Sequence, residues 1–137
     1  MSWTDSLIRL RNFEIEELRK RLLALLDRRA ALEAELNALD EEARREAAHA
    51  RGDAEAGWYM AGFRVGWKQR RARVEADLRA LAAEETGARD ALSQAFEALK
   101  KVEKAAEGIA TAAAKDEARR ETQALDEQAL RRRVVGS

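Results

Sequence analysis

The chain has 137 residues with 26 basic and 26 acidic side chains, and it contains neither proline nor cysteine. Balanced, well-mixed charge gives no reason to expect nucleic acid or an acidic membrane as a partner. The lack of cysteine fits a reducing cytoplasm and equally fits any protein without disulfides. We expect no secretion signal and no membrane span, because no stretch approaches about 18 apolar residues. The absence of proline and the abundance of good helix formers permit very long helices.

The first predicted element is a helix over about residues 4–50. It is expected to begin near Thr4, Asp5 or Ser6, which can each accept a hydrogen bond from a free backbone N–H. Its apolar residues alternate in spacings of three and four, the heptad pattern of helices that wind around each other. Arg11 and Arg29 occupy seam positions, where arginine either snorkels to solvent or fixes the register. The apolar positions are Ile8, Ile15, Leu18, Leu22, Leu25, Leu32, Leu36, Leu39 and Ala43.

A turn is predicted within residues 50–57, where the heptad pattern has faded. Gly52 suits the left-handed residue that ends a helix, and Asp53 suits the N-cap of the next helix. Pairing the two apolar stripes by symmetry centres the tip slightly later, near Trp58. We therefore expect residues 1–137 to form a single hairpin domain.

Residues 57–73 differ in composition from the rest of the chain, with two of the three tryptophans, the only tyrosine and no acidic residue. Met60 and Trp67 fall on the seam line, but the other aromatic residues cannot all share so narrow a seam. Exposed aromatics beside cations are typical of protein–protein interfaces, which we favour. Packing of the aromatics at the hairpin end is one alternative, and single-stranded nucleic acid is another. The aromatic candidates are Trp58, Tyr59, Phe63 and Trp67, and the cations are Arg64, Lys68, Arg70, Arg71 and Arg73.

A second helix is predicted over about residues 58–133. Its apolar stripe ends at Ile109, so the helix is much longer than its partner and residues 111–133 overhang as a partner-binding arm or a solvated tail. The predicted fold is all-α, a long two-helix antiparallel coiled-coil hairpin with an overhanging C-terminal helix. The stripe comprises Val74, Leu78, Leu81, Ala88, Leu92, Ala95, Leu99, Val102, Ala106 and Ile109, and a weaker line follows at Ala114, Ala118, Leu125 and Ala129.

No catalytic constellation is visible in the sequence. His49 is the only histidine, and a metal site would need further ligands near it. The glycines form no Walker-type loop, and a two-helix rod offers no water-excluding cavity. We expect no enzyme activity, no metal, no cofactor and no small-molecule substrate.

Four parts of the chain carry a family resemblance: residues 7–11; residues 57–59 with Phe63 and the Arg70–Arg71 pair; residues 89–96 with 99–103; and residues 123–131, which contain Leu125-Asp126-Glu127. Together they resemble the FliJ family of flagellar type III protein export, in its alphaproteobacterial form. The resemblance implies a non-enzymatic, cytoplasmic, stalk-like coiled coil that is peripherally associated with the flagellar base at the inner membrane.

The resemblance also implies three partners: the hexameric export ATPase, the export-gate membrane protein and export chaperones. The ATPase-facing end would be the overhang with the start of the first helix. Its candidate residues are Arg120, Leu125, Asp126, Glu127, Ala129 and Leu130. The gate-facing candidates, Trp58, Tyr59, Phe63 and Trp67, come from composition alone. The alternative to this coupling role is an unrelated, self-associating structural adaptor.

Overall fold

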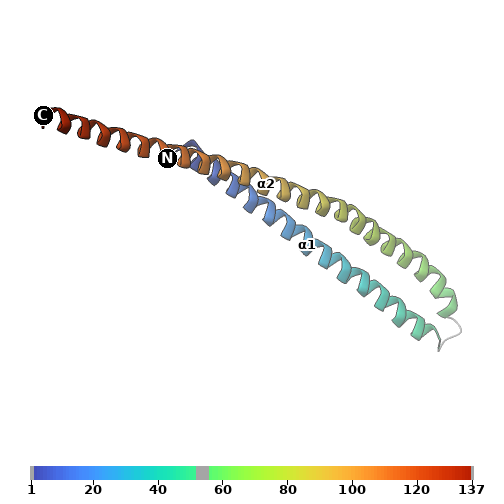
Figure 1. Cartoon of the computed structure of the whole chain (residues 1–137). Coiled ribbons are helices and arrows are strands. Elements are labelled where there is room, and N and C mark those ends of the chain that lie inside the picture. Colours follow the sequence, from blue (N-terminus) through green and yellow to red (C-terminus); the bar gives the residue numbers. More distant parts are fainter. Residues whose placement is uncertain (1, 52–55, 137) are drawn as a thin grey trace. The chain divides into compact units, whose positions relative to one another are not determined.

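The computed structural model describes residues 2–51 and 56–136, which form two helices (Figure 1). Helix α1 is Trp3–Ala50 and helix α2 is Ala56–Val135, and no strand occurs within these ranges. The predicted all-α class is confirmed. Gly52 and Asp53, the residues predicted to form the turn, lie outside the described residues. Trp58 lies inside α2, so the symmetry estimate of the tip is too late in the chain.

The start of α1 is capped two residues before Thr4, the earliest of the predicted caps. Ser2 accepts a hydrogen bond on its Oγ from the backbone N–H of Asp5, at 3.3 Å. The hydroxyls of Ser2 and Thr4 are 2.8 Å apart, and Thr4 is buried. Ser2 is therefore the N-cap, whereas Thr4 occupies an inward position that it shares with the seam residues of α1.

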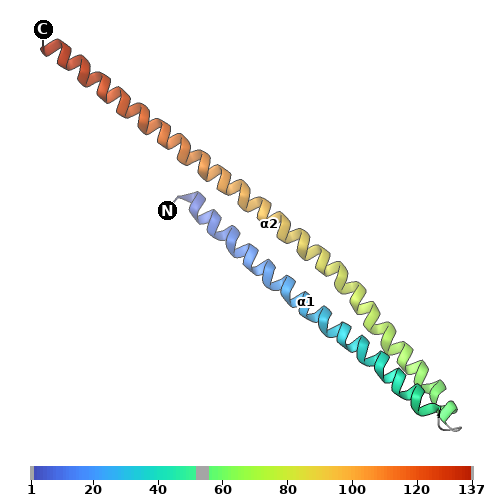
Figure 2. The same cartoon turned by 60° about the horizontal axis from the view of Figure 1, so that its bottom comes forward.

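The chain divides into two compact units, which are described separately. The hairpin unit is Ile15–Gln94, and the terminal unit combines Met1–Glu14 with Ala95–Ser137. Within the hairpin unit, α1 and α2 run antiparallel, side by side (Figures 1 and 2). This arrangement confirms the predicted helical hairpin.

The core of the hairpin unit is a single seam between the two helices. Its buried residues recur every seven positions, as expected for a coiled coil. No described side chain is completely sealed from solvent, because two helices alone cannot enclose one. Met60 is buried on the same seven-residue line, which confirms its predicted place in the seam. The core comprises Leu25, Leu32, Leu39, Val74, Leu81 and Ala88, with Leu22, Leu36, Trp67 and Leu78 packed against it.

The terminal unit is packed at one end only. Thr4 and Ala95 are buried, and Ile8, Val102 and Ala106 are partly buried. Every residue from 107 to 136 is exposed, and this part of α2 continues past the N-terminal end of α1 (Figure 2). We call residues 107–136 the C-terminal arm. It confirms the predicted overhang.

Neither α1 nor α2, over the ranges given above, contains a segment with the length and hydropathy needed to cross a bilayer.

Candidate partner-binding surfaces

An ion pair between an exposed arginine and a buried carboxylate crosses the seam of the hairpin unit. Arg29 Nη1 lies 2.8 Å from Glu85 Oε2, and the Glu85 side chain is only 7% exposed against 46% for Arg29. The hydrogen bond to Glu85 is the main cause that raises the pKa of Arg29, and Glu33, 3.3 Å away on α1, adds to it. Arg29 thus reaches across to the other helix, which favours the register-fixing interpretation of this seam arginine.

The other seam arginine behaves differently. Arg11 lies in the terminal unit and pairs with Glu14 on its own helix, at 3.1 Å. This is an ordinary pair between residues three apart on one helix. Arg11 therefore gives no sign of setting a register.

A second set of ion pairs ties α2 to α1 nearer the turn. Arg71 donates to Asp40 Oδ1 at 3.0 Å and also pairs with Glu75, while Arg70 pairs with Glu42 at 3.2 Å. The hydrogen bond from Arg71 is the main cause that lowers the pKa of Asp40. Two of the five cations proposed for phosphate contact are thus neutralised within the molecule, which weakens the nucleic-acid alternative.

Trp67 is held by the hairpin itself. Its indole Nε1 donates to the Leu39 carbonyl oxygen at 2.7 Å, and the Arg71 guanidinium lies 5.8 Å from the ring centroid. The ring also packs against the core cluster. A partly buried indole with a satisfied N–H accounts for this tryptophan by packing alone. Of the other gate-facing candidates, Phe63 is partly buried.

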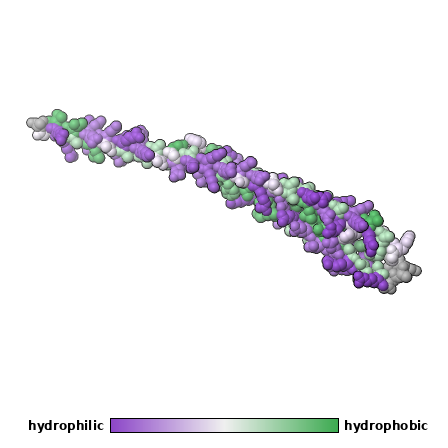
Figure 3. Space-filling view, turned by 45° about the vertical axis from the view of Figure 1, so that its right-hand side comes forward, coloured by the Kyte–Doolittle hydropathy of each residue, from purple (hydrophilic) through white to green (hydrophobic). Residues whose placement is uncertain are grey.

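Three apolar side chains near the start of α2 are exposed: Trp58 at 91%, Tyr59 and Val65. We call them the tip patch. Trp58 and Val65 lie seven residues apart, on one side of the helix. Figure 3 shows green, hydrophobic residues interspersed with purple, hydrophilic ones on the surface at this end of the hairpin. The sequence prediction missed Val65, although its spacing from Trp58 was a usable signal.

The C-terminal arm carries all six ATPase-facing candidates, and all are exposed. Arg120 pairs with Asp116 at 3.3 Å along the helix. Leu125 and Ala129 are four residues apart, so they lie on one side of α2. The other candidates are Asp126, Glu127 and Leu130.

A further exposed apolar stripe, missed by the sequence prediction, lies at the start of α1. Trp3, Leu10 and Phe13 are all exposed in the terminal unit. Their spacings of seven and three place them on one side of the helix. The stripe therefore adds apolar surface to the same unit that carries the arm.

The described residues offer no grouping of three or more His, Cys, Asp or Glu side chains suited to a metal ion. His49, the single histidine, is exposed. The described part of the chain gives no positive indication of catalysis.

Comparison with known proteins finds close relatives of the chain. The chain is 48% identical over 134 residues to the Flagellar FliJ protein of Caulobacter vibrioides strain NA1000 / CB15N, a match that covers 98% of this chain and 96% of the relative. The protein of the same name from strain ATCC 19089 / CIP 103742 / CB 15 matches equally. No family model matches the chain, and no solved structure matches it.

Proposed function

The chain belongs to the FliJ family of flagellar proteins, and from this premise we propose that it is a non-enzymatic component of the flagellar type III export apparatus. In this role the coiled coil binds the hexameric export ATPase, the export gate and export chaperones. It promotes assembly of the ATPase ring and couples ATP hydrolysis to export. It works at the flagellar base, peripherally associated with the inner membrane.

The observation that carries this proposal is the exposed C-terminal arm. Residues 107–135 continue α2 as a regular helix, and every one of them is exposed. An isolated helix gains little stability from propensity alone, so a long unburied helix favours a partner that covers it. The ATPase ring is the occupant that we propose, with Leu125 and Ala129 as the apolar contact.

The gate-facing role is assigned to the tip patch and its surroundings. Trp58 and Tyr59 are available for contact, whereas Trp67 is engaged with Leu39. Exposed tryptophan and tyrosine are enriched at the centres of interfaces. We therefore narrow the four gate-facing candidates to Trp58 and Tyr59 as direct contacts, with Phe63 and Trp67 supporting the helix from which they project.

The ATPase-facing role is tested by the double variant Leu125→Arg, Ala129→Arg. Recovery of the export ATPase in co-purification should fall at least tenfold, equivalent to about 1.4 kcal/mol. The matched control is Ala113→Arg, Ala124→Arg, which adds the same two charges to the opposite side of the arm and should retain binding. Circular dichroism checks that both variants remain helical. Equal ATPase recovery by the Leu125→Arg, Ala129→Arg protein and the wild type contradicts this part of the proposal.

A further inference from the structure

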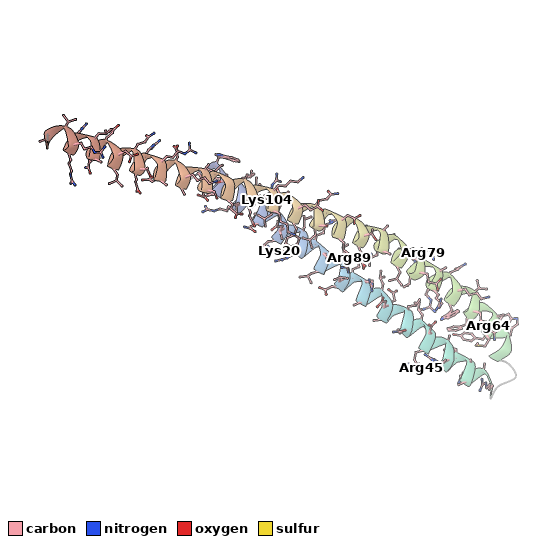
Figure 4. All side chains as sticks on the ribbon, viewed as in Figure 1. Lys20, Arg45, Arg64, Arg79, Arg89 and Lys104 are labelled. Carbon is pink, nitrogen blue, oxygen red and sulfur yellow. The ribbon has the colours of Figure 1, made fainter. Side chains whose placement is uncertain are left out.

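The C-terminal arm carries an apolar line on the side of α2 that is turned away from the seam. The line lies roughly 130° around the helix axis from Val102 and Ala106, which are partly buried in the terminal unit. Side chains project from both sides of the arm in Figure 4, so this line is open to a partner. Its members, all exposed, are Ala114, Ala118, Leu125 and Ala129.

The spacing of this apolar line suits a second helix that packs along the arm. Its members repeat at an interval of eleven residues, and eleven residues make three helical turns, so the line runs almost straight along the helix. A shallow recess beside the line has the spacing of the four residues that receive one side chain of a packed helix. The recess is lined by Lys115, Ala118, Arg119 and Thr122, with Gln123 next to them.

The two edges of the apolar line carry opposite charges. Lys115 and Arg119 lie along one edge, and Glu117 and Glu121 lie along the other. All four side chains are exposed, and none of them has an ion-pair partner in the part of the chain that the structure describes. The ion pair that Arg120 makes lies on the other side of the helix. The charges of both edges are therefore available to a partner helix.

A second copy of the arm has the charges that this surface requires. When two arms pack in parallel along their apolar lines, the basic edge of each arm lies against the acidic edge of the other. Lys115 and Arg119 of each copy then face the carboxylates of the second copy, and symmetry repeats this contact. In an antiparallel pair each edge would meet its own counterpart, so that Glu121 would face Glu121 of the second copy. A partner helix of a single charge would be attracted by one edge and repelled by the other.

We propose that two copies of the chain associate through their arms as a parallel, in-register pair of helices. Alanine at three of the four apolar positions lets the helices approach closely but buries little apolar surface, so the dimer forms at high protein concentration and separates on dilution. The inference goes beyond the proposed function and does not rest on it. The dimer covers Leu125 and Ala129, so the two copies separate before these residues contact the ATPase.

The chain contains no cysteine, so single Ala→Cys variants of the purified full-length protein test the arrangement directly. At about 0.1 mM, where mass action favours association, Ala118→Cys should form an intermolecular disulfide, because a parallel pair places both copies of residue 118 at the same level. The matched control Ala113→Cys, on the other side of the arm, should give at least tenfold less disulfide. Equal yields from these two variants overturn the inference. A disulfide of Ala118→Cys that forms only in a mixture with Leu125→Cys indicates an antiparallel pair and also overturns it.

Two charge-reversed variants test the complementarity of the edges. Lys115→Glu with Arg119→Glu makes both edges acidic, and Glu117→Lys with Glu121→Lys makes both edges basic. In sedimentation velocity each variant alone should dimerise at least tenfold more weakly than the wild type, whereas an equimolar mixture of the two should form a heterodimer. Dimerisation of either variant at wild-type strength, or a mixture that stays monomeric while circular dichroism shows intact helices, overturns the inference. Neither experiment contains the ATPase, so a negative result leaves the proposed function standing.

Discussion

The ion pair between Arg29 and Glu85 should respond very unequally to removal of its two members. Arg29→Leu leaves the Glu85 carboxylate buried in the seam, where its Oε1 already lacks a hydrogen-bond partner in the described part of the chain. Leaving that carboxylate uncompensated costs about 3 kcal/mol, the lower end of the range for a buried charge, because a two-helix seam is close to solvent. With a urea m-value of about 2 kcal/mol/M, the unfolding midpoint should fall by about 1.5 M.

Glu85→Leu should instead be neutral or stabilise the protein by up to about 1 kcal/mol. The new leucine extends the apolar line of Leu81 and Ala88, while Arg29, already 46% exposed, keeps Glu33 as a partner. Urea unfolding followed by circular dichroism at 222 nm measures both variants. Equal destabilisation by Arg29→Leu and Glu85→Leu would refute the reasoning, because it would mean that the buried carboxylate is not the costly member. The double leucine variant should restore most of the stability lost in Arg29→Leu.

Three other results are expected. Arg71 holds the pKa of Asp40 below its ordinary value. The contribution of Asp40 to stability is therefore present above about pH 4 and is lost as the pH falls below that value. Between pH 5 and pH 3, the wild type should lose more stability than the Asp40→Asn variant does. Trp67→Phe should cost about 1 kcal/mol through the lost hydrogen bond, and Trp58→Phe, at an exposed site, should leave the urea midpoint unchanged. In hydrogen exchange, the amides of residues 107–135 should exchange much faster than the seam amides of the hairpin unit. Equal protection of the two sets would mean that the arm is covered in solution, contrary to this expectation.

The heptad pattern predicted the seam well because burial in a two-helix coiled coil depends almost entirely on position within the seven-residue repeat. Leu25, Leu32 and Leu39 are buried at intervals of seven on α1, as are Val74 and Leu81 on α2. The end of the apolar stripe predicted only approximately where α2 loses its partner, because Ile109, its last member, is exposed and Ala106 is the last partly buried residue. Both features follow from a periodicity that a single sequence displays directly.

The same periodicity could not identify which residues face each other. A heptad stripe remains continuous when one helix slides by seven residues, so the pairing of Arg29 with Glu85 had no signal in the sequence. The cap at Ser2 depends on local geometry that the stripe does not encode. The hydrogen bond from Trp67 to the Leu39 carbonyl oxygen could be predicted only if the register of the two helices were already known.

The spacing of the cross-helix contacts in the hairpin unit also bears on how the chain folds. The bonds from Trp67 to Leu39 and from Arg70 to Glu42 each join residues 28 apart, whereas Arg29 and Glu85 are separated by 56. Closing a loop twice as long costs about 0.6 kcal/mol more in chain entropy. The contacts of Trp67 with Leu39 and of Arg70 with Glu42 should therefore form first. Pairing of the two helices should then extend from the turn toward their other ends. The Arg29–Glu85 pair should form after them, and it should disfavour a hairpin of slipped register, which would leave Glu85 buried and uncompensated.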